Sequence, residues 1–331
     1  MKPFSRIIFI FLLTVPLSVT TAATQKSSPF EQKQIDQFIN EMVKDHSFDR
    51  TELKNILNQA EKKQTILDAI SRPAEGKPWH EYRPIFMTES RIREGVKFLK
   101  NNQTILAAAE EKFGVPASII TAIIGVETRY GRFRGSYRVI DSLSTLAFAY
   151  PKRAKFFRGQ LKEFLIMARE EKMDPLKPLG SYAGAMGQPQ FIPSSFRSYA
   201  IDFDGDGRRD LWENMDDIIG SVANYFSRHH WRAGEAITSR ATVKGQAPRA
   251  LLKNGYKPSF KAASLKAHNI KGGDNIPPDQ QVALIALKQK RGNEYWIGRH
   301  NFYVITRYNH SPLYAMAVYQ LSEAIRSGAK L

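Results

Sequence analysis

The segment from Pro116 to Glu127 constrains the fold most, because it is an apolar run that ends in an acid. Its isoleucines at 119, 120, 123 and 124 recur at helical spacing and share one face with the glutamate. Pro116 suits the first turn of such a helix, and Gly131 suits its end. The sequence therefore predicts a helix whose last turn carries a carboxyl group on the face that meets the core.

Two effects should raise the pKa of the Glu127 carboxyl group. Burial disfavours its charged form, and the negative end of the helix dipole lies close by. A carboxylic acid that stays protonated near neutral pH can protonate a leaving-group oxygen. An ion pair between Glu127 and Arg129, Arg132 or Arg134 is an equally good interpretation of the same pattern, and it would make the glutamate structural.

The first residues have the anatomy of a cleavable export signal. Lys2 and Arg6 precede an apolar run that fades by residue 19, and small residues then end it. The run is shorter than the roughly 20 apolar residues that a membrane span needs. We therefore expect residues 1–23 to be removed and the mature chain to begin near Thr24, with an uncleaved N-terminal anchor as the alternative.

The cysteine content and the net charge restrict the covalent links and the binding partners that we expect. The chain has no cysteine, so we expect it to fold without disulfides and without a lipid anchor on an N-terminal cysteine. The net charge is +17, and loss of the two basic residues in the signal leaves 47 basic against 32 acidic residues, or +15. Such a charge attracts polyanions. Export argues against nucleic acid, and no basic amphipathic helix marks a membrane binder, so an acidic wall polymer fits best.

Hydrophobic periodicity predicts a mainly α (α+β) protein with a small β-rich part. After the signal we expect four regions: an N-terminal helical region at 24–115, a catalytic core at 116–235, a β-rich subdomain at 236–310, and a C-terminal helix at 311–331 that packs on the core. Prolines and glycines predict a long loop at 72–87. Strand-like alternation occurs at 236–244, 281–289 and 294–308. Asp49 is expected to cap a helix.

Residues 175–210 are rich in Gly, Pro, Ser and Asp, which is typical of loops that carry function. Gly184 and Gly187 allow the backbone to approach a ligand closely. Ser181 and Gln190 offer neutral groups that suit an amide or hydroxyls. Ordinary hydrogen bonding within the loop is the alternative role of both side chains.

Residues 202–213 match the EF-hand calcium loop, with Gly207 at the sixth position for the sharp turn. A solvated acidic loop is the alternative. We expect one structural calcium ion, because a lone loop lacks the paired partner of calcium sensors. The predicted ligands are Asp202, Asp204, Asp206, the backbone carbonyl of Arg208, and Glu213.

Two long motifs carry a resemblance to a known family. Residues 123–131 read Ile-Ile-Gly-Val-Glu-Thr-Arg-Tyr-Gly, and residues 181–195 read Ser-Tyr-Ala-Gly-Ala-Met-Gly-Gln-Pro-Gln-Phe-Ile-Pro-Ser-Ser. Both closely resemble the membrane-bound lytic murein transglycosylase B family, from about residue 30 to the end of the chain. The resemblance implies a lysozyme-like catalytic core, peptidoglycan as substrate, a periplasmic location, and Glu127 as the sole catalytic acid/base.

The resemblance also implies roles for further residues. Ser181 and Gln190 would help to hold the acetamido group of a sugar. Four tyrosines would bind the glycan along its groove: Tyr82, Tyr225, Tyr303 and Tyr308. In the family the last acid of the calcium loop comes slightly later, which makes Asp216 a rival to Glu213 as metal ligand. The lack of a cysteine departs from the lipid-anchored members.

A single acid favours a substrate-assisted reaction, because most glycosidases use two carboxylates. We expect Glu127 to act first as acid and then as base, without a cofactor, and to leave 1,6-anhydromuramyl ends. The rival interpretations are a hydrolytic muramidase, which a second acid would favour, and a non-catalytic peptidoglycan-binding protein. We expect a monomer that binds glycan strands and no nucleic acid, with weak association to the membrane or to wall-synthesis proteins left open.

Overall fold

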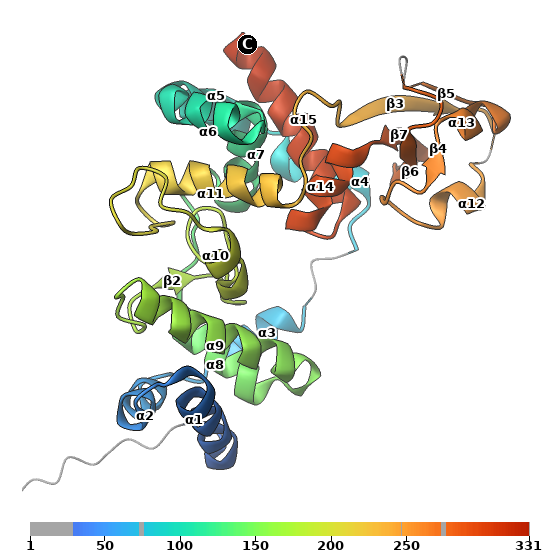
Figure 1. Ribbon diagram of the computed structural model, residues 1–331. Coiled ribbons are helices and arrows are strands. Elements are labelled where there is room, and N and C mark those ends of the chain that lie inside the picture. The colour runs from blue at the N-terminus through green and yellow to red at the C-terminus, as the bar shows by residue number, and fades with distance from the viewer. Residues whose placement is uncertain (1–28, 73–75, 246, 273–275, 331) are drawn as a thin grey trace, which may run out of the picture.

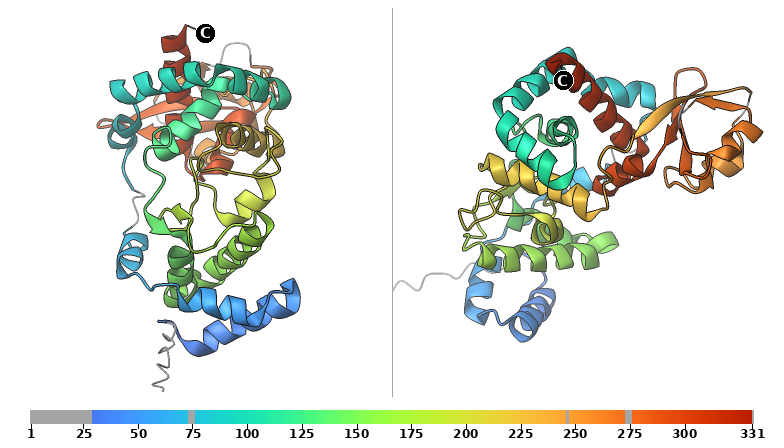
Figure 2. Two further views of the ribbon diagram at one scale, coloured as in Figure 1. Left: turned by 90° about the vertical axis from the view of Figure 1, so that its left-hand side faces the viewer. Right: turned by 45° about the horizontal axis from the view of Figure 1, so that its top comes forward.

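The computed structural model describes residues 29–72, 76–245, 247–272 and 276–330, so the expected export signal lies outside the described residues. Helices dominate this part of the chain, and one antiparallel sheet forms a lobe at the side of the helical body (Figures 1 and 2). The expectation of a mainly helical α+β protein is confirmed. None of the described helices combines the length and apolar character that crossing a membrane requires.

The helical body is assembled from both ends of the chain. Its N-terminal helices are α1 (Gln32–His46), α2 (Arg50–Asn58), α3 (Gln64–Ile70), α4 (Trp79–Phe86), α5 (Glu89–Asn101), α6 (Gln103–Phe113) and α7 (Ala117–Thr128). Next come α8 (Val139–Ala149), the 3-10 turn η1 (Pro151–Arg153), α9 (Ala154–Glu170), α10 (Pro193–Tyr199) and α11 (Met215–Arg228). The C-terminal helices are α14 (His300–Tyr308) and α15 (Pro312–Ala329).

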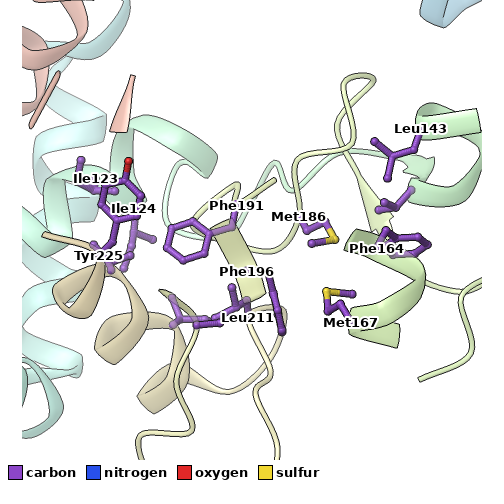
Figure 3. Packing of buried hydrophobic residues seen from close by; sticks show 14 of the residues in the cluster. Ile123, Ile124, Leu143, Phe164, Met167, Met186, Phe191, Phe196, Leu211 and Tyr225 are labelled. Carbon is purple, nitrogen blue, oxygen red and sulfur yellow. The ribbon is translucent and has the colours of Figure 1, made fainter. Parts of the chain in front are cut away.

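Helix α7 lies inside the upper half of the body, where α5, α6, α11 and α15 pack against it (Figure 1). Its isoleucines are buried, as the apolar pattern predicts. Figure 3 shows the same core continuing from Ile123 through Phe191 and Met186 to Phe164 of α9. One hydrophobic core therefore connects the helix that carries Glu127 with the lower helices α8 and α9.

The lobe contains β3 (Thr238–Val243), α12 (Arg249–Leu252), β4 (Phe260–Lys261), α13 (Ala263–Ala267), β5 (Ile270–Gly272), β6 (Gln281–Lys288) and β7 (Asn293–Gly298). The strand order is β4-β6-β7-β3-β5, and every neighbouring pair is antiparallel. Strand β6 faces two cores: Leu284 packs within the lobe, whereas Ile285 and Leu287 pack on the body. The lobe begins and ends at one place, because Thr238 pairs with Gly298.

Three predictions of local structure are wrong in detail. The segment 72–87 contains helix α4 despite Pro84, because burial of Trp79 and packing on α15 offset the lost hydrogen bond. The strand expected at 294–308 ends at Gly298 and is followed by α14, in which Phe302 and Ile305 are buried at helical spacing. Helix α7 ends at Thr128, before Gly131.

Other local predictions are confirmed. The Asp49 carboxylate accepts a hydrogen bond from the Glu52 N–H at 2.8 Å and caps α2. Strands β3 and β6 lie within the predicted segments 236–244 and 281–289. The limits of the four regions, at 115, 235 and 310, stay predictions.

Candidate functional site

Glu127 is in the last turn of α7, where its side chain is partly exposed above buried isoleucines. The hydroxyl of Tyr314, at the start of α15, donates a hydrogen bond to its Oε1 at 2.6 Å. Burial raises the pKa of Glu127 from 4.5 to about 7, although the bond from Tyr314 opposes the shift. A large fraction of this carboxyl is therefore protonated near neutral pH, as the sequence predicts.

The arginines that follow Glu127 have other partners. Arg129 donates to the Glu94 carboxylate at 2.7 Å, and Arg132 lies 3.7 Å from the same carboxylate. Arg134 pairs with Glu213 at 2.6 Å. Among the described residues no lysine or arginine forms an ion pair with Glu127, so the structural ion pair that the sequence left open is not formed.

Helix α5 fixes the C-terminal end of α7. The Arg91 guanidinium donates to the carbonyl of Gly125 at 2.7 Å. The Tyr130 hydroxyl donates to the Arg91 carbonyl at 2.9 Å, and its ring covers Gly125 so closely that a larger residue there would overlap it. Arg129 takes a left-handed conformation that ends the helix. The position of Glu127 is thus fixed on both sides: α5 and the Tyr130 ring hold the turn before it, and the left-handed Arg129 ends the helix after it.

A stack of tyrosines extends from Glu127 to the loop that follows Ser181. The rings of Tyr314 and Tyr308 lie 6.4 Å apart and 8° from parallel. Tyr308 donates to the Pro189 carbonyl at 2.6 Å. Burial, followed by the nearby charge of Glu127, raises the pKa of both hydroxyls. Tyr314 thus bonds to the acid, Tyr308 bonds to the loop that follows Ser181, and the two rings stack on each other. Together they link Glu127 to that loop.

The other predicted tyrosines differ in their surroundings. Tyr82 is partly exposed on α4, and burial together with the charge of Glu127 raises its pKa to about 12. Tyr225 is only 6% exposed, and its hydroxyl donates to the Arg307 carbonyl, so it supports the ring of Tyr308, 4.7 Å away, from within the core. Tyr303 stacks on Tyr256 of the lobe. Tyr82 and Tyr308 thus lie close enough to Glu127 for its charge to help raise their pKa, and Tyr225 contacts Tyr308 from within the core.

Ser181 and Gln190 both bond within their loop. The Ser181 hydroxyl oxygen accepts from the N–H groups of Ala183 and Ala185, at 3.3 and 3.0 Å. The Gln190 side-chain amide donates to the carbonyls of Gly187 and Arg134, at 2.9 and 3.2 Å. A hydroxyl proton on Ser181 and a carbonyl oxygen on Gln190 remain for a ligand. Hydrogen bonding within the loop therefore leaves both side chains able to bind a ligand as well.

The loop after Glu127 and the Ser181 loop touch through their backbones. Strands β1 (Tyr137–Arg138) and β2 (Leu179–Gly180) form a short antiparallel pair. Gly135 has a φ of +92°, and a side-chain carbon added there would overlap the Gly180 carbonyl. These two glycines allow the two loops to approach closely. This contact fixes the position of Ser181 relative to the C-terminal end of α7.

The calcium-type loop gathers three carboxylates. Potential ligand oxygens of Asp202, Asp204 and Asp217 all lie within 4.8 Å of one another. Burial, followed by the charges of Asp204 and Asp202, raises the pKa of Asp217 to about 6. Gly207 makes the turn with a φ of +88°. Hard oxygen donors with crowded negative charge are what Ca²⁺ stabilises, so these residues fit that ion.

Asp217 was missed by the sequence analysis, because it lies beyond the twelve residues of the loop pattern. Of the other predicted ligands, Asp206 is exposed and accepts a hydrogen bond from the Arg208 N–H. Asp216 is in the first turn of α11, and the Glu213 carboxylate is paired with Arg134. Neither Glu213 nor Asp216 belongs to the carboxylate group that the described residues form.

Comparisons with known proteins agree with this geometry. A family model described as "Transglycosylase SLT domain" matches residues 30–323. The chain is 45% identical over 299 residues to the membrane-bound lytic murein transglycosylase B of Escherichia coli (strain K12), covering 87% of this chain and 81% of that protein. The soluble lytic transglycosylase SltB1 from Pseudomonas aeruginosa is 49% identical with a TM-score of 0.86, covering 90% of this chain and 100% of that one. The Escherichia coli lytic transglycosylase Slt35 in complex with calcium is 43% identical with a TM-score of 0.85, covering 94% and 99%.

One protonated acid beside tyrosine rings and a loop with hydroxyl and amide groups can donate a proton to a bound sugar and hold it by ring faces and hydroxyls. The fold and the site thus define a glycan-cleaving enzyme with a lysozyme-like core. The chain belongs to the transglycosylase SLT family, and it is a lytic transglycosylase that acts on peptidoglycan.

Proposed function

We propose that this lytic transglycosylase cleaves the β-1,4 bond between N-acetylmuramic acid and N-acetylglucosamine, with Glu127 as the only acid/base, and leaves 1,6-anhydromuramyl ends. The observation that supports this most is the pKa of Glu127, which burial raises to about 7. Burial is the cause of this upward shift, and no second carboxylate among the described residues contributes to it. In the proposed reaction a single acid serves both proton transfers.

In the first step, the protonated Glu127 carboxyl donates its proton to the glycosidic oxygen. The bond between that oxygen and the muramyl anomeric carbon breaks, and the N-acetylglucosamine side leaves with a new hydroxyl group. The acetamido oxygen of the muramyl residue stabilises the positive charge on the anomeric carbon. The Tyr314 hydroxyl, already 2.6 Å from the carboxyl, stabilises the carboxylate that this step creates.

In the second step, the Glu127 carboxylate removes the proton from the 6-hydroxyl of the same muramyl residue. The 6-oxygen attacks the anomeric carbon and closes the 1,6-anhydro ring. Glu127 returns to its protonated form, and no water is consumed. A pKa near 7 suits this cycle, because the group has to give and take a proton at similar cost.

Substrate binding is assigned to the side chains around Glu127. Ser181, through its hydroxyl proton, and Gln190, through its side-chain carbonyl, would hold the acetamido group and neighbouring hydroxyls. Tyr82 and Tyr308 would offer ring faces and hydroxyls next to the acid. We also assign Tyr303 to the glycan path, further along toward the lobe, and Tyr225 to the support of Tyr308.

Calcium is proposed as a single structural ion, without a part in catalysis. The carboxylates of Asp202, Asp204 and Asp217 would hold it, and their clustered charge supports this assignment. Asp206 and the backbone carbonyl of Arg208 remain further candidate ligands of the same loop. The ion would supply positive charge that offsets the repulsion between these acids and stabilises the loop before α11.

The expected site of action is the periplasm, where the substrate is. The export-type sequence at residues 1–23 and the positive charge of the chain support this location and an anionic polymer as partner. We propose a monomer that binds glycan strands directly.

The test is digestion of purified sacculi by the mature protein and by its Glu127→Gln variant, with mass spectrometry of the released muropeptides. The expected products are anhydro-ended fragments, one water lighter than reducing ends, from the unmutated protein alone. Reducing ends from that protein would instead support a hydrolytic muramidase with the same acid. Equal cleavage by both proteins would refute the role of Glu127.

A further inference from the structure

The sheet lobe carries a large share of the positive charge of the chain. Residues 238–298 hold eleven basic and three acidic residues, or +8, in less than a fifth of the sequence, whereas the whole chain has a net charge of +17. All eleven lysines and arginines are exposed. Among the described residues only one of them, Arg240, forms an ion pair, with Glu294 at 3.2 Å. The other cations of the lobe are therefore available to an anionic partner.

The charge is most one-sided in residues 249–271, which we call the outer layer. This segment contains α12, β4, α13 and the start of β5. It has no acidic residue, and its cations follow one another at intervals of four or five residues: Arg249, Lys253, Lys257, Lys261, Lys266 and Lys271. A surface of this kind attracts anions wherever it is exposed.

The outer layer lies on the side of the sheet that is turned away from the helical body. Leu251 of α12 and Leu265 of α13 pack with Leu284 of β6, whereas the next residue of that strand, Ile285, packs on the body. Because successive side chains of a strand point to opposite faces, α12 and α13 cover the face opposite the body. Figure 1 shows both helices at the end of the lobe that is farthest from α7.

The lobe offers charge without an apolar anchor. The large apolar side chains that the described residues expose all lie outside the lobe: Ile85, Phe133, Phe156, Leu179 and Tyr182. Tyr256 and Phe260 of the outer layer are partly buried, and Tyr256 stacks on Tyr303 of α14. Protein partners usually need aromatic or apolar side chains at the centre of the interface. A partner that is recognised by charge alone therefore fits this surface better than a second protein.

We propose that the outer layer docks the protein on an anionic phospholipid bilayer. A plane of phosphate headgroups requires no groove, and each lysine or arginine held near it adds to the attraction. The wall polymer carries its carboxylates on separate stem peptides, whereas headgroups form a continuous layer that reaches all the docked cations within a Debye length of about 8 Å. Such docking needs no basic amphipathic helix, because the cations come from short helices and strands of one folded lobe.

Docking through this face leaves the reaction independent of the bilayer. The outer layer covers the far side of the sheet, and Glu127 is on α7 inside the body. The protein would thus be held at the membrane surface while α7 still faces a glycan strand. The inference does not rest on the reaction proposed for Glu127.

The test is cosedimentation of the mature protein with vesicles of two compositions, phosphatidylglycerol with phosphatidylethanolamine and pure phosphatidylcholine. We expect binding to the anionic vesicles at low salt, and binding to the neutral ones that is weaker by roughly tenfold or more. Raising the salt to about 1 M, where the Debye length is about 3 Å, should release the protein. The outer-layer variant Lys253→Gln, Lys257→Gln and Lys266→Gln should bind anionic vesicles roughly tenfold or more weakly than the unmutated protein.

A matched control carries Lys33→Gln, Lys54→Gln and Lys97→Gln. These three lysines are exposed on α1, α2 and α5 and form no ion pair among the described residues. The control loses the same net charge and should bind the anionic vesicles as the unmutated protein does. Both variants should keep the unmutated Tm and the cleavage of soluble glycan fragments, which shows that they are folded.

Three results would overturn the proposal. Equal binding to both kinds of vesicle would show that headgroup charge is not recognised, and equal losses in the two variants would show that only total charge matters. If the outer-layer variant lost binding to purified sacculi while its binding to anionic vesicles was unchanged, the surface would belong to the wall polymer instead. Cleavage by Glu127 is measured apart from all three, so its failure would leave this inference standing.

Discussion

Replacement of Glu127 by Gln should stabilise the protein at alkaline pH while it abolishes cleavage. The unfolded glutamate titrates at 4.5 and the folded one at about 7. Between these values the folded state binds more protons than the unfolded state, so stability falls as pH rises through this range and stays low above it. The shift of about 2.5 pKa values corresponds to about 3 kcal/mol.

Glutamine avoids this penalty because it is neutral at every pH, and its side-chain carbonyl can still accept the hydrogen bond from Tyr314. Thermal unfolding of both proteins, followed by circular dichroism between pH 4.5 and 8.5, measures the difference. The variant should gain little at pH 4.5 and about 3 kcal/mol above pH 7.5, which corresponds to roughly 4 °C in Tm for a chain of this size. Glu111→Gln, which removes one charge from the exposed surface of α6, controls for net charge.

A gap between Glu127→Gln and the unmutated protein that is the same at every pH would refute the reasoning. It would mean that the carboxyl group is as well solvated in the folded state as in the unfolded chain. The activity of the unmutated protein should follow the same group, since the first step needs the protonated acid: cleavage should decline as pH rises above about 7.

Three further changes test other parts of the site. Tyr314→Phe removes the bond that lowers the pKa of Glu127, so the alkaline limb of the pH–rate profile should move up by roughly one pH unit; an unchanged limb would contradict the role of that bond. Asp217→Asn should remove most of the stabilisation that calcium gives, which is about 2.7 kcal/mol at a hundredfold excess over Kd and is measured as a rise in Tm; an undiminished rise in Tm would exclude this residue as a ligand. Gly135→Ala should cost at least about 2 kcal/mol in urea unfolding, because its φ is positive and the added carbon overlaps the Gly180 carbonyl; wild-type stability would show that the loops separate freely.

The sequence was informative wherever a short segment carries the whole signal. The isoleucine ladder predicts α7 and the burial of its glutamate, and Asp49 predicts a cap, because both patterns involve residues within a few turns of each other. The loop motif predicts an acidic cluster for the same reason. These features do not depend on how distant segments pack.

The missed features all depend on contacts between distant segments. Tyr314 lies 187 residues from Glu127 and meets it only because α15 packs on α7. Asp217 joins the acidic cluster because the turn before α11 brings its side chain back to the loop. Helix α4 forms despite Pro84 because Trp79 is buried against the body. Pattern reading cannot anticipate tertiary packing that overrides local preference.

The sheet lobe enters and leaves the body at one point, where Thr238 pairs with Gly298. Just outside that pair, the Asn301 side-chain amide donates to the carbonyls of Arg232 and Glu235, which ties the incoming and outgoing chain together. The lobe is therefore topologically an insertion: its two attachment points are already adjacent, although Ile285 and Leu287 of β6 also pack on the body. Evolution can lengthen, shorten or exchange such an insertion while the geometry around Glu127 stays constant.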